Sequence, residues 1–443
     1  MSDDQKDSGA GKKFAGIVIP PDLKWSNFFN MYLATLLIGC ITVVPVVLQP
    51  AFLKEIINIP EEQAGSINAG LMNMSQIATI LFIGLIGILS DKVGRRILAI
   101  IGFLICGIGY MLFGHAKDIS LAMGITSLEG QIFVTYIIRF LLGIGLILGY
   151  PQFITLVADY TYERDRGKGM AINGIMMGMG AIVVFGVLVQ IAGKTGLMSL
   201  FYMSGILGFA GAFITRLWLV DRLPKERPKR LGIKETYSAV SKNFALKVSY
   251  VAAFVVRSDV IVTGTFLIVW MVYVADRFGM SPVKASAQGG VAGMVMSAAS
   301  FVVFPIAGVL IDRWGRVPVL IAGLLFAGIG FCLTGIVENP FSPVLYLCVS
   351  FIGIGVAGSL PGTNTLASDA SPRQLLGSIL GGLNTMAPFG IFFFLQVGGF
   401  LFDKVGCAAP FILKGAANLV CGLWILMVKN RIVLPKEDER TLT

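Results

Sequence analysis

Long apolar blocks separated by short polar stretches run along almost the whole chain. Twelve blocks are long enough to cross about 30 Å of hydrocarbon as helices, which takes about 20 residues each. The apolar residues run continuously, as in Ile97–Gly109, whereas strands of a membrane barrel alternate apolar and polar residues. The pattern predicts an all-α integral membrane protein with helices at 28–50, 66–89, 97–115, 132–158, 169–192, 198–220, 248–275, 287–311, 317–337, 344–367, 376–401 and 408–428.

Composition and the polar stretches add the domain plan. The 443 residues are 56% hydrophobic and 14% charged, whereas a soluble domain is charged at roughly a quarter of its positions. The polar N-terminus has no short apolar core with a cleavage site, so we do not expect a secretory signal. The longest polar interruption carries a predicted surface helix at Ile233–Ser241. We expect an N-terminal tail (1–24), a six-helix bundle (25–220), a linker (221–247), a second six-helix bundle (248–428) and a C-terminal tail (429–443).

The net charge of +10 is distributed very unevenly along the chain. Of the 35 lysines and arginines, Arg139 and Arg257 fall inside predicted spans, and most others fall on the side of the N-terminus. Cytoplasmic loops of membrane proteins carry such an excess, so we expect both termini in the cytoplasm of a bacterial inner membrane. This topology explains the basic charge without a nucleic-acid partner. Seven fall on the opposite side: Lys54, Lys117, Lys194, Arg277, Lys284, Lys404 and Lys414.

The two halves of the chain share a pattern. The segment Gly87-Ile-Leu-Ser-Asp91-Lys-Val-Gly94-Arg-Arg after the second span matches Gly308-Val-Leu-Ile-Asp312-Arg-Trp-Gly315-Arg-Val after the eighth. A second match, at an offset of 210 residues, pairs Pro151 with Pro361 and Asp159 with Asp369. An internal duplication of a six-helix unit accounts for both matches. In transporters built from such repeats, the solute site lies between the repeated units.

The run Gly-x-x-x-Asp-x-x-Gly-Arg-Arg in this topology resembles the signature loop of the major facilitator superfamily. The resemblance covers the whole chain and implies two pseudo-symmetric six-helix bundles that transport by alternating access. Asp91 is positioned to cap a helix or to pair with Arg95 or Arg96. By resemblance, a cytoplasmic gate cluster would comprise Asp91, Arg95 and Asp159 in the first half, and Asp312, Arg316 and Asp369 in the second. The alternative is that these arginines only anchor the topology.

Arg139 in the fourth span is followed four residues later by Gly143, which resembles a second motif of the family. That motif occurs in proton-coupled members, where the arginine is linked to proton movement. An arginine inside hydrocarbon costs at least about 2.5 kcal/mol, so it usually faces a partner or a cavity. Snorkelling of the side chain to the outer interface is the alternative.

The seventh span carries Arg257 and Asp259. On a continuous helix they lie about 200° apart and cannot pair on one face. Asp259 shares a polar and aromatic stripe, so it is the better candidate for the solute cavity and for carrying a proton when buried. Arg257 shares a packing face and is a structural residue, a partner for another polar group, or an anion contact. Further candidates are Thr263, Trp270 and Tyr273 on the Asp259 stripe, and Asn364 near a helical proline.

These features together predict a monomeric secondary active transporter whose partners are a small solute, protons and the lipid bilayer. The two arginines favour an organic anion such as a carboxylate, moved by proton symport. Efflux of drugs or metabolites is an alternative, although the fifth span lacks the Gly-Pro of the family's antiporter motif. A non-transporting solute sensor is another. The single His115, the scattered cysteines and the lack of a phosphate-binding loop argue against an enzyme, a metal site, a cofactor or ATP-driven transport.

Overall fold

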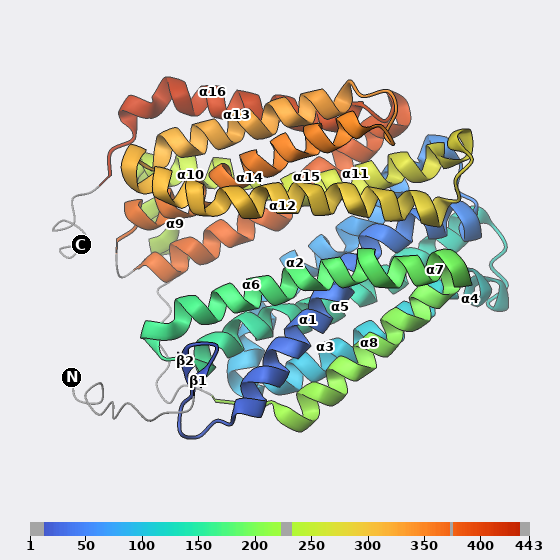
Figure 1. Cartoon of the computed structure of the whole chain (residues 1–443), viewed down its shortest axis with the longest axis horizontal. Helices are drawn as coiled ribbons and strands as arrows, with labels where there is room; N and C mark the ends of the chain where they lie inside the picture. Colours follow the sequence, from blue (N-terminus) through green and yellow to red (C-terminus); the bar gives the residue numbers. More distant parts are fainter. Residues whose placement is uncertain (1–12, 223–232, 373–374, 435–443) are drawn as a thin grey trace. The chain divides into compact units, whose positions relative to one another are not determined.

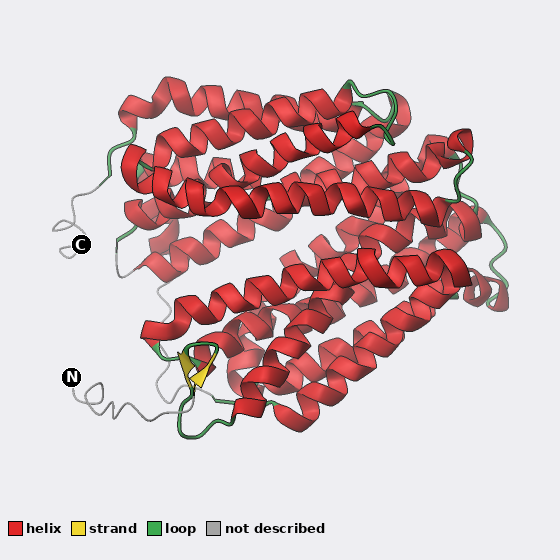
Figure 2. Ribbon diagram, in the orientation of Figure 1, coloured by secondary structure: helices red, strands yellow, loops and turns green. Residues whose placement is uncertain are grey.

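Helices make up nearly all of the computed structural model, which describes residues 13–222, 233–372 and 375–434 (Figures 1 and 2). Within these residues, 12 helices are long and apolar enough to cross a membrane, one for each predicted block. The helical membrane class is therefore confirmed. The expected N-terminal tail up to residue 12, the linker at 223–232 and the C-terminal tail from residue 435 lie outside the described residues.

The helices group into two units. The first unit takes in Met1–Pro45 and Leu81–Arg227, and the second takes in Val46–Ile80 and Pro228–Thr443. The halves of α1 and α2 nearest their connection thus cluster with the C-terminal helices. The predicted boundaries at 25–220 and 248–428 stay a prediction. The helices up to the linker are α1 (Trp25–Phe52), α2 (Ala64–Val93), α3 (Arg95–Gly114), α4 (Ala116–Ala122), α5 (Leu128–Tyr160), α6 (Arg166–Val183), α7 (Val189–Thr195) and α8 (Leu197–Trp218).

The helices after the linker repeat this order. They are α9 (Ile233–Lys242), α10 (Phe244–Val256), α11 (Asp259–Val274), α12 (Pro282–Trp314), α13 (Arg316–Gly335), α14 (Pro343–Ala370), α15 (Leu376–Lys404) and α16 (Ala409–Val428). A π-helical turn, Leu53–Ile57, extends α1, and a 3-10 turn, Ala275–Phe278, extends α11. The short helix α9 matches the surface helix predicted in the linker.

The packing of each unit shows the duplication that the sequence predicts. In the first unit α3 packs against α5 and α8, and in the second α13 packs against α14 and α16. A Cβ on Gly102 would overlap the backbone of Gly149, and one on Gly323 would overlap the backbone of Ser359. Only glycine permits such close helix approach. The matching helices of the two halves therefore use the same kind of contact.

The seventh predicted span is two helices rather than one. Helix α10 ends at Val256 and α11 begins at Asp259, with Arg257 and Ser258 between them. Neither proline nor glycine marks this break. Serine and aspartate, however, both favour the start of a helix, so Ser258-Asp259 is the local signal that the sequence offers.

A small hairpin precedes α1. Strand β1 (Lys13–Phe14) pairs antiparallel with β2 (Ile17–Val18) within the part of the chain predicted as a polar tail (Figure 2). The backbone N–H of Val18 donates to a carboxylate oxygen of Asp165 over 3.1 Å. The Phe14 ring lies 5.3 Å from that of Trp25 between centroids. The hairpin therefore docks on the first unit through one carboxylate and an aromatic contact.

Candidate functional site

A pocket lies within the second unit beside the break between α10 and α11. Its volume is about 440 Å³. Among the described residues that line it, one is a cation, four are neutral and polar, one is apolar, and none is a carboxylate. The lining residues are Arg257 at the break, Asn364, Thr365 and Ser368 on α14, and Leu380 and Asn384 on α15.

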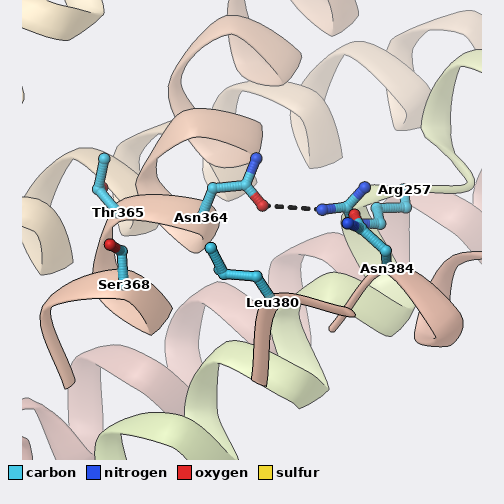
Figure 3. A pocket seen from close by; sticks show the side chains of 6 residues that line it. All are labelled: Arg257, Asn364, Thr365, Ser368, Leu380 and Asn384. Carbon is cyan, nitrogen blue, oxygen red and sulfur yellow. Dashed lines mark hydrogen bonds between the residues drawn. The ribbon is translucent and has the colours of Figure 1, made fainter. Parts of the chain in front are cut away.

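Arg257 is the charge of this pocket. Its guanidinium donates to Oδ1 of Asn364 over 2.8 Å, and the two side chains point toward one another (Figure 3). Its Nε is buried and has no hydrogen-bond partner among the described residues. Such an orphaned donor is costly unless something accepts from it. The pocket can therefore offer the positive charge of the guanidinium to a group that enters it.

Asp259 lies in a different place, between α11 and α16. Its Oδ1 is 2.6 Å from the Nζ of Lys414 and accepts a hydrogen bond of 3.0 Å from Asn418, while Oδ2 has no hydrogen-bond partner in the described part of the chain. Both charged side chains are 0% exposed. The sequence interpretation placed Lys414 with the loops opposite the N-terminus. That placement is wrong, because Lys414 faces inward from α16, where Asp259 and the Val255 carbonyl compensate its charge.

The predicted faces of the seventh span are also wrong. The structure puts Arg257 on the pocket and Asp259 in a helix interface, the reverse of the face assignment. The two residues do lie on different sides, as the angle of 100° per residue predicts. The error lies in the choice of side, because the polar and aromatic stripe of Asp259 is buried by packing and does not line the pocket. Asn364, by contrast, does lie in the pocket beside Arg257.

The other residues of the predicted Asp259 stripe are packed inside the second unit. Thr263, Trp270 and Tyr273 are between 1% and 7% exposed. The Thr263 hydroxyl donates to the carbonyl of Asp259, and the Trp270 ring lies 6.2 Å from that of Phe411. The structure does not bring these three residues to the pocket beside Arg257.

Arg139 is buried in α5 at 2% exposure. It therefore does not snorkel out of the first unit. Its electrostatic neighbours include Tyr110 and Cys106 of α3. The Tyr110 hydroxyl in turn donates to the carbonyl of Ile41 over 2.5 Å. The arginine thus belongs to a buried polar cluster that links α5 to α3.

The first predicted gate cluster is assembled in the first unit. Arg95 lies 2.8 Å from Asp159 and 3.6 Å from Asp91, measured between charged atoms. Arg96 is not part of it, because its backbone N–H donates to Asp221 over 2.9 Å and its guanidinium donates to a backbone carbonyl of α8. Asp221, from the predicted linker, therefore caps the start of α3.

The second half repeats part of this cluster. Arg316 lies 2.5 Å from Asp369, the pair that corresponds to Arg95 and Asp159. Asp312 is exposed and forms no ion pair with a described residue. Gly94 (φ 108°) and Gly315 (φ 94°) directly precede the two arginines. This backbone conformation favours glycine, which explains the shared Gly-Arg of both loops.

Two charges meet helix ends elsewhere in the second unit. Asp403 of α15 accepts hydrogen bonds from the backbone N–H groups of Gly65 (2.7 Å) and Ser66 (2.9 Å), at the start of α2. Lys54 donates to the carbonyl of Val272, at the end of α11, over 3.1 Å. Each charge has the sign that the helix dipole favours. Neither contact could be predicted from the sequence, because the partners are far apart along the chain.

The comparison with protein families decides the class. The family model described as "Major Facilitator Superfamily" matches residues 31–303 and 262–441. The chain belongs to the Major Facilitator Superfamily. The family consists of transporters, not enzymes, as the signature loop predicts.

Among relatives in the superfamily, Magnetosome protein MamH of Paramagnetospirillum magneticum is 31% identical over 90% of this chain and 92% of its own length. Magnetosome protein MamZ of Magnetospirillum gryphiswaldense is 29% identical over 94% of this chain, which spans only 65% of MamZ. Quinolone resistance protein NorA of Staphylococcus aureus is 23% identical over 93% of this chain and 97% of its own length.

A solved superfamily structure shows the same fold. The crystal structure of a D-xylose-proton symporter aligns with a TM-score of 0.70 at 18% identity, over 90% of this chain and 97% of that one. This likeness concerns the fold alone. It does not say which solute this superfamily member handles, so we look for that in the residues of its own pocket. Three of them, Thr365, Ser368 and Asn384, were not among the site residues predicted from the sequence.

Proposed function

We propose that this protein is a secondary active transporter that moves a small organic anion, such as a carboxylate, by alternating access and proton symport. The carrying observation is the pocket beside the helix break, where Arg257 is the charged residue among the described lining. A guanidinium holds a carboxylate through charge-assisted hydrogen bonds, which are stronger than neutral ones. The amides and hydroxyls of Asn364, Thr365, Ser368 and Asn384 supply further donors.

Efflux of amphipathic drugs is the second candidate, favoured by the likeness to a quinolone resistance protein. A pocket for cationic amphipathic compounds needs apolar lining and no competing cation. Here Arg257 would repel a cation. This charge favours the anion.

Proton coupling is proposed for Asp259. It is a buried carboxylate at the N-terminus of α11, two residues from Arg257, and one of its oxygens accepts no hydrogen bond from any residue that the structure describes. A proton on Oδ2 would neutralise the carboxylate while Oδ1 keeps its contacts with Lys414 and Asn418. Arg139 is a second candidate for the coupling path, because it is charged and buried within the first unit.

The duplicated charge clusters are proposed as gate elements. Arg95 with Asp159, and Arg316 with Asp369, each tie the start of one helix to the end of another. Contacts of this kind can form in one state of an alternating-access cycle and break in the next. Asp91 would assist the first cluster, whereas Asp312 would act only in a state in which it finds a partner.

The proposed location is a bacterial plasma membrane with both termini in the cytoplasm, supported by the uneven basic charge. The relatives named magnetosome proteins also favour a role in the magnetosome system of the host. A fluorescent fusion expressed in a magnetosome-forming bacterium tests the location and the magnetosome role. Uniform labelling of the plasma membrane alone would contradict the magnetosome role.

The deciding experiment is uptake into proteoliposomes under an imposed pH gradient. The solutes are a labelled panel of carboxylates, sugars and cationic dyes. We expect carboxylates to accumulate when the outside is acidic, and Arg257→Gln to raise their KM by roughly 10- to 150-fold, the value of losing a hydrogen bond to a charged group. Arg313→Gln changes an exposed arginine of the same unit and serves as the matched control.

The outcomes separate the candidates. Accumulation of cationic dyes alone would support efflux and overturn the anion proposal. Movement of no solute, together with binding of one, would support a sensor. Carboxylate uptake that ignores the pH gradient would remove proton coupling while leaving the anion pocket in place.

A further inference from the structure

A backbone carbonyl at the break between α10 and α11 accepts a hydrogen bond from a lysine side chain. In a continuous helix the carbonyl of Val255 would accept from the backbone N–H of Asp259. In this structure it accepts instead from the Ser258 hydroxyl over 2.8 Å and from the Nζ of Lys414 over 2.7 Å. A lysine from a distant helix thus satisfies a carbonyl that the break leaves open.

Lys414 contacts both sides of the break at once. One hydrogen bond reaches Val255 of α10, and an ion pair of 2.6 Å reaches Asp259, the first residue of α11. The Nζ lies over the Phe394 ring, 4.4 Å from the ring centroid. Asn418, four residues further along α16, also bonds Asp259. The ammonium is therefore held from several directions, and the break is held with it.

Stability alone is a weak reason for this arrangement. A buried ion pair is often no more stable than apolar residues of similar volume, since both charges lose their water. Arg257, the residue in the pocket, lies between the two segments that Lys414 joins. Its direction depends on the backbone at the break, so a group that fixes this backbone also fixes the guanidinium.

We infer that Lys414 is a positioning residue for the anion pocket: it joins the ends of the α10–α11 break and so sets where Arg257 presents its charge. This inference rests on the proposed function, because it gives Arg257 the role of anion contact. Lys414 itself does not line the pocket. Its effect on the solute passes through the backbone of residues 255–259.

The test reads the charge in the pocket without needing the natural solute. Ser368→Cys places a thiol in the lining, and its modification is followed by mass spectrometry of that residue. The probes are a negatively charged methanethiosulfonate (sulfonatoethyl) and a positively charged one (trimethylammonioethyl), with rates normalised to a free thiol. We expect a preference for the negative reagent on the order of tenfold, because a nearby guanidinium attracts it. Adding Arg257→Gln should abolish that preference.

Two neutral pairs then test Lys414. Asp259→Asn with Lys414→Met removes both charges and the donor to Val255, whereas Asp259→Asn with Lys414→Gln removes the charges but keeps an N–H donor. We expect the Met pair to lose most of the tenfold preference and the Gln pair to retain most of it. Lys404→Met, at an exposed lysine of α15, should leave it unchanged.

The possible failures are distinguishable. Equal preference with and without Arg257 would refute the anion pocket itself. A clear preference that persists in both pairs would leave the pocket standing and overturn the role of Lys414. A Met pair that fails to fold beside a folded Gln pair would also overturn it, because Lys414 would then hold the bundle rather than the pocket. Carboxylate uptake adds a second readout, since a raised KM with unchanged Vmax is expected of the Met pair alone.

Discussion

The buried pair of Asp259 and Lys414 makes a quantitative prediction about folding stability. At 2.6 Å and an effective dielectric constant of about 20, the attraction between the two charges is about 6 kcal/mol, before the cost of removing them from water. Removing one partner leaves the other charge buried and alone. We therefore expect Lys414→Met or Asp259→Asn each to lower the free energy of unfolding by about 3–5 kcal/mol.

The double substitution should behave differently. With both charges gone, neither side chain is left uncompensated, and we expect a free energy of unfolding within about 1–2 kcal/mol of the parent. The assay is reversible unfolding in mixed micelles by SDS, followed by tryptophan fluorescence, and Trp270 reports from the same unit. The double-mutant cycle should give a coupling of several kcal/mol.

The matched control is an exposed ion pair. Arg277 and Glu61 lie 3.4 Å apart in the same unit, with side chains 68% and 50% exposed. Exposed pairs contribute at most about 1 kcal/mol, so Arg277→Gln should change little. Single effects below about 1 kcal/mol at both Asp259 and Lys414, adding up in the double variant, would refute the reasoning.

Three further predictions concern other charges. Arg95→Gln should lower the free energy of unfolding by about 1–3 kcal/mol by leaving a buried carboxylate unpaired, and more than Arg316→Gln, whose pair is more exposed. Asp403→Ala should cost about 0.5–2 kcal/mol and speed hydrogen exchange at the first amides of α2, because it removes a helix cap. The backbone N–H of Val18 and the ammonium of Lys168 hold the pKa of Asp165 below its ordinary value of about 3.9, so docking of the hairpin should be complete above that value and lost as pH falls through the lower one. Tryptophan fluorescence measures this release.

Each of these has an outcome that would contradict it. Equal losses of unfolding free energy in Arg95→Gln and Arg316→Gln would show that burial does not determine how much each ion pair contributes to stability. Unchanged exchange at the start of α2 would show that Asp403 does not cap it. An Asp165→Asn variant that keeps the same acid transition would assign the release of the hairpin to another group.

Most of the fold could be predicted from the sequence, because an apolar block must be long enough to cross the membrane as a helix. Every predicted block became a helical span, the seventh as two helices, and the loop motif led to the contact of Arg95 with Asp159 and to its repeat in the second half. The repeat succeeded because glycine, arginine and aspartate at fixed spacing define a local geometry that the chain uses twice.

The pocket was harder to predict, because a stripe of polar and aromatic residues can pack against a neighbouring helix as well as line a cavity. The stripe of Asp259 is buried in packing, whereas Arg257, on another side of the span, lines the pocket. The burial of Lys414 could have been predicted from the sequence, since a lysine inside a predicted span requires a buried partner or a cavity. Which partner it meets depends on tertiary packing between segments 155 positions apart.

The ion pair that closes the α10–α11 break also imposes an order on biosynthesis. Asp259 enters the membrane with the seventh span, and Lys414 is made only after four more spans have followed. Placing either charge at the centre of a lone span costs about 2.5–3.5 kcal/mol. Until α16 arrives, the second half must therefore shelter a carboxylate whose partner does not yet exist. The helix that neutralises it is the twelfth span, so the second half reaches its final electrostatic state only after α16 has been made.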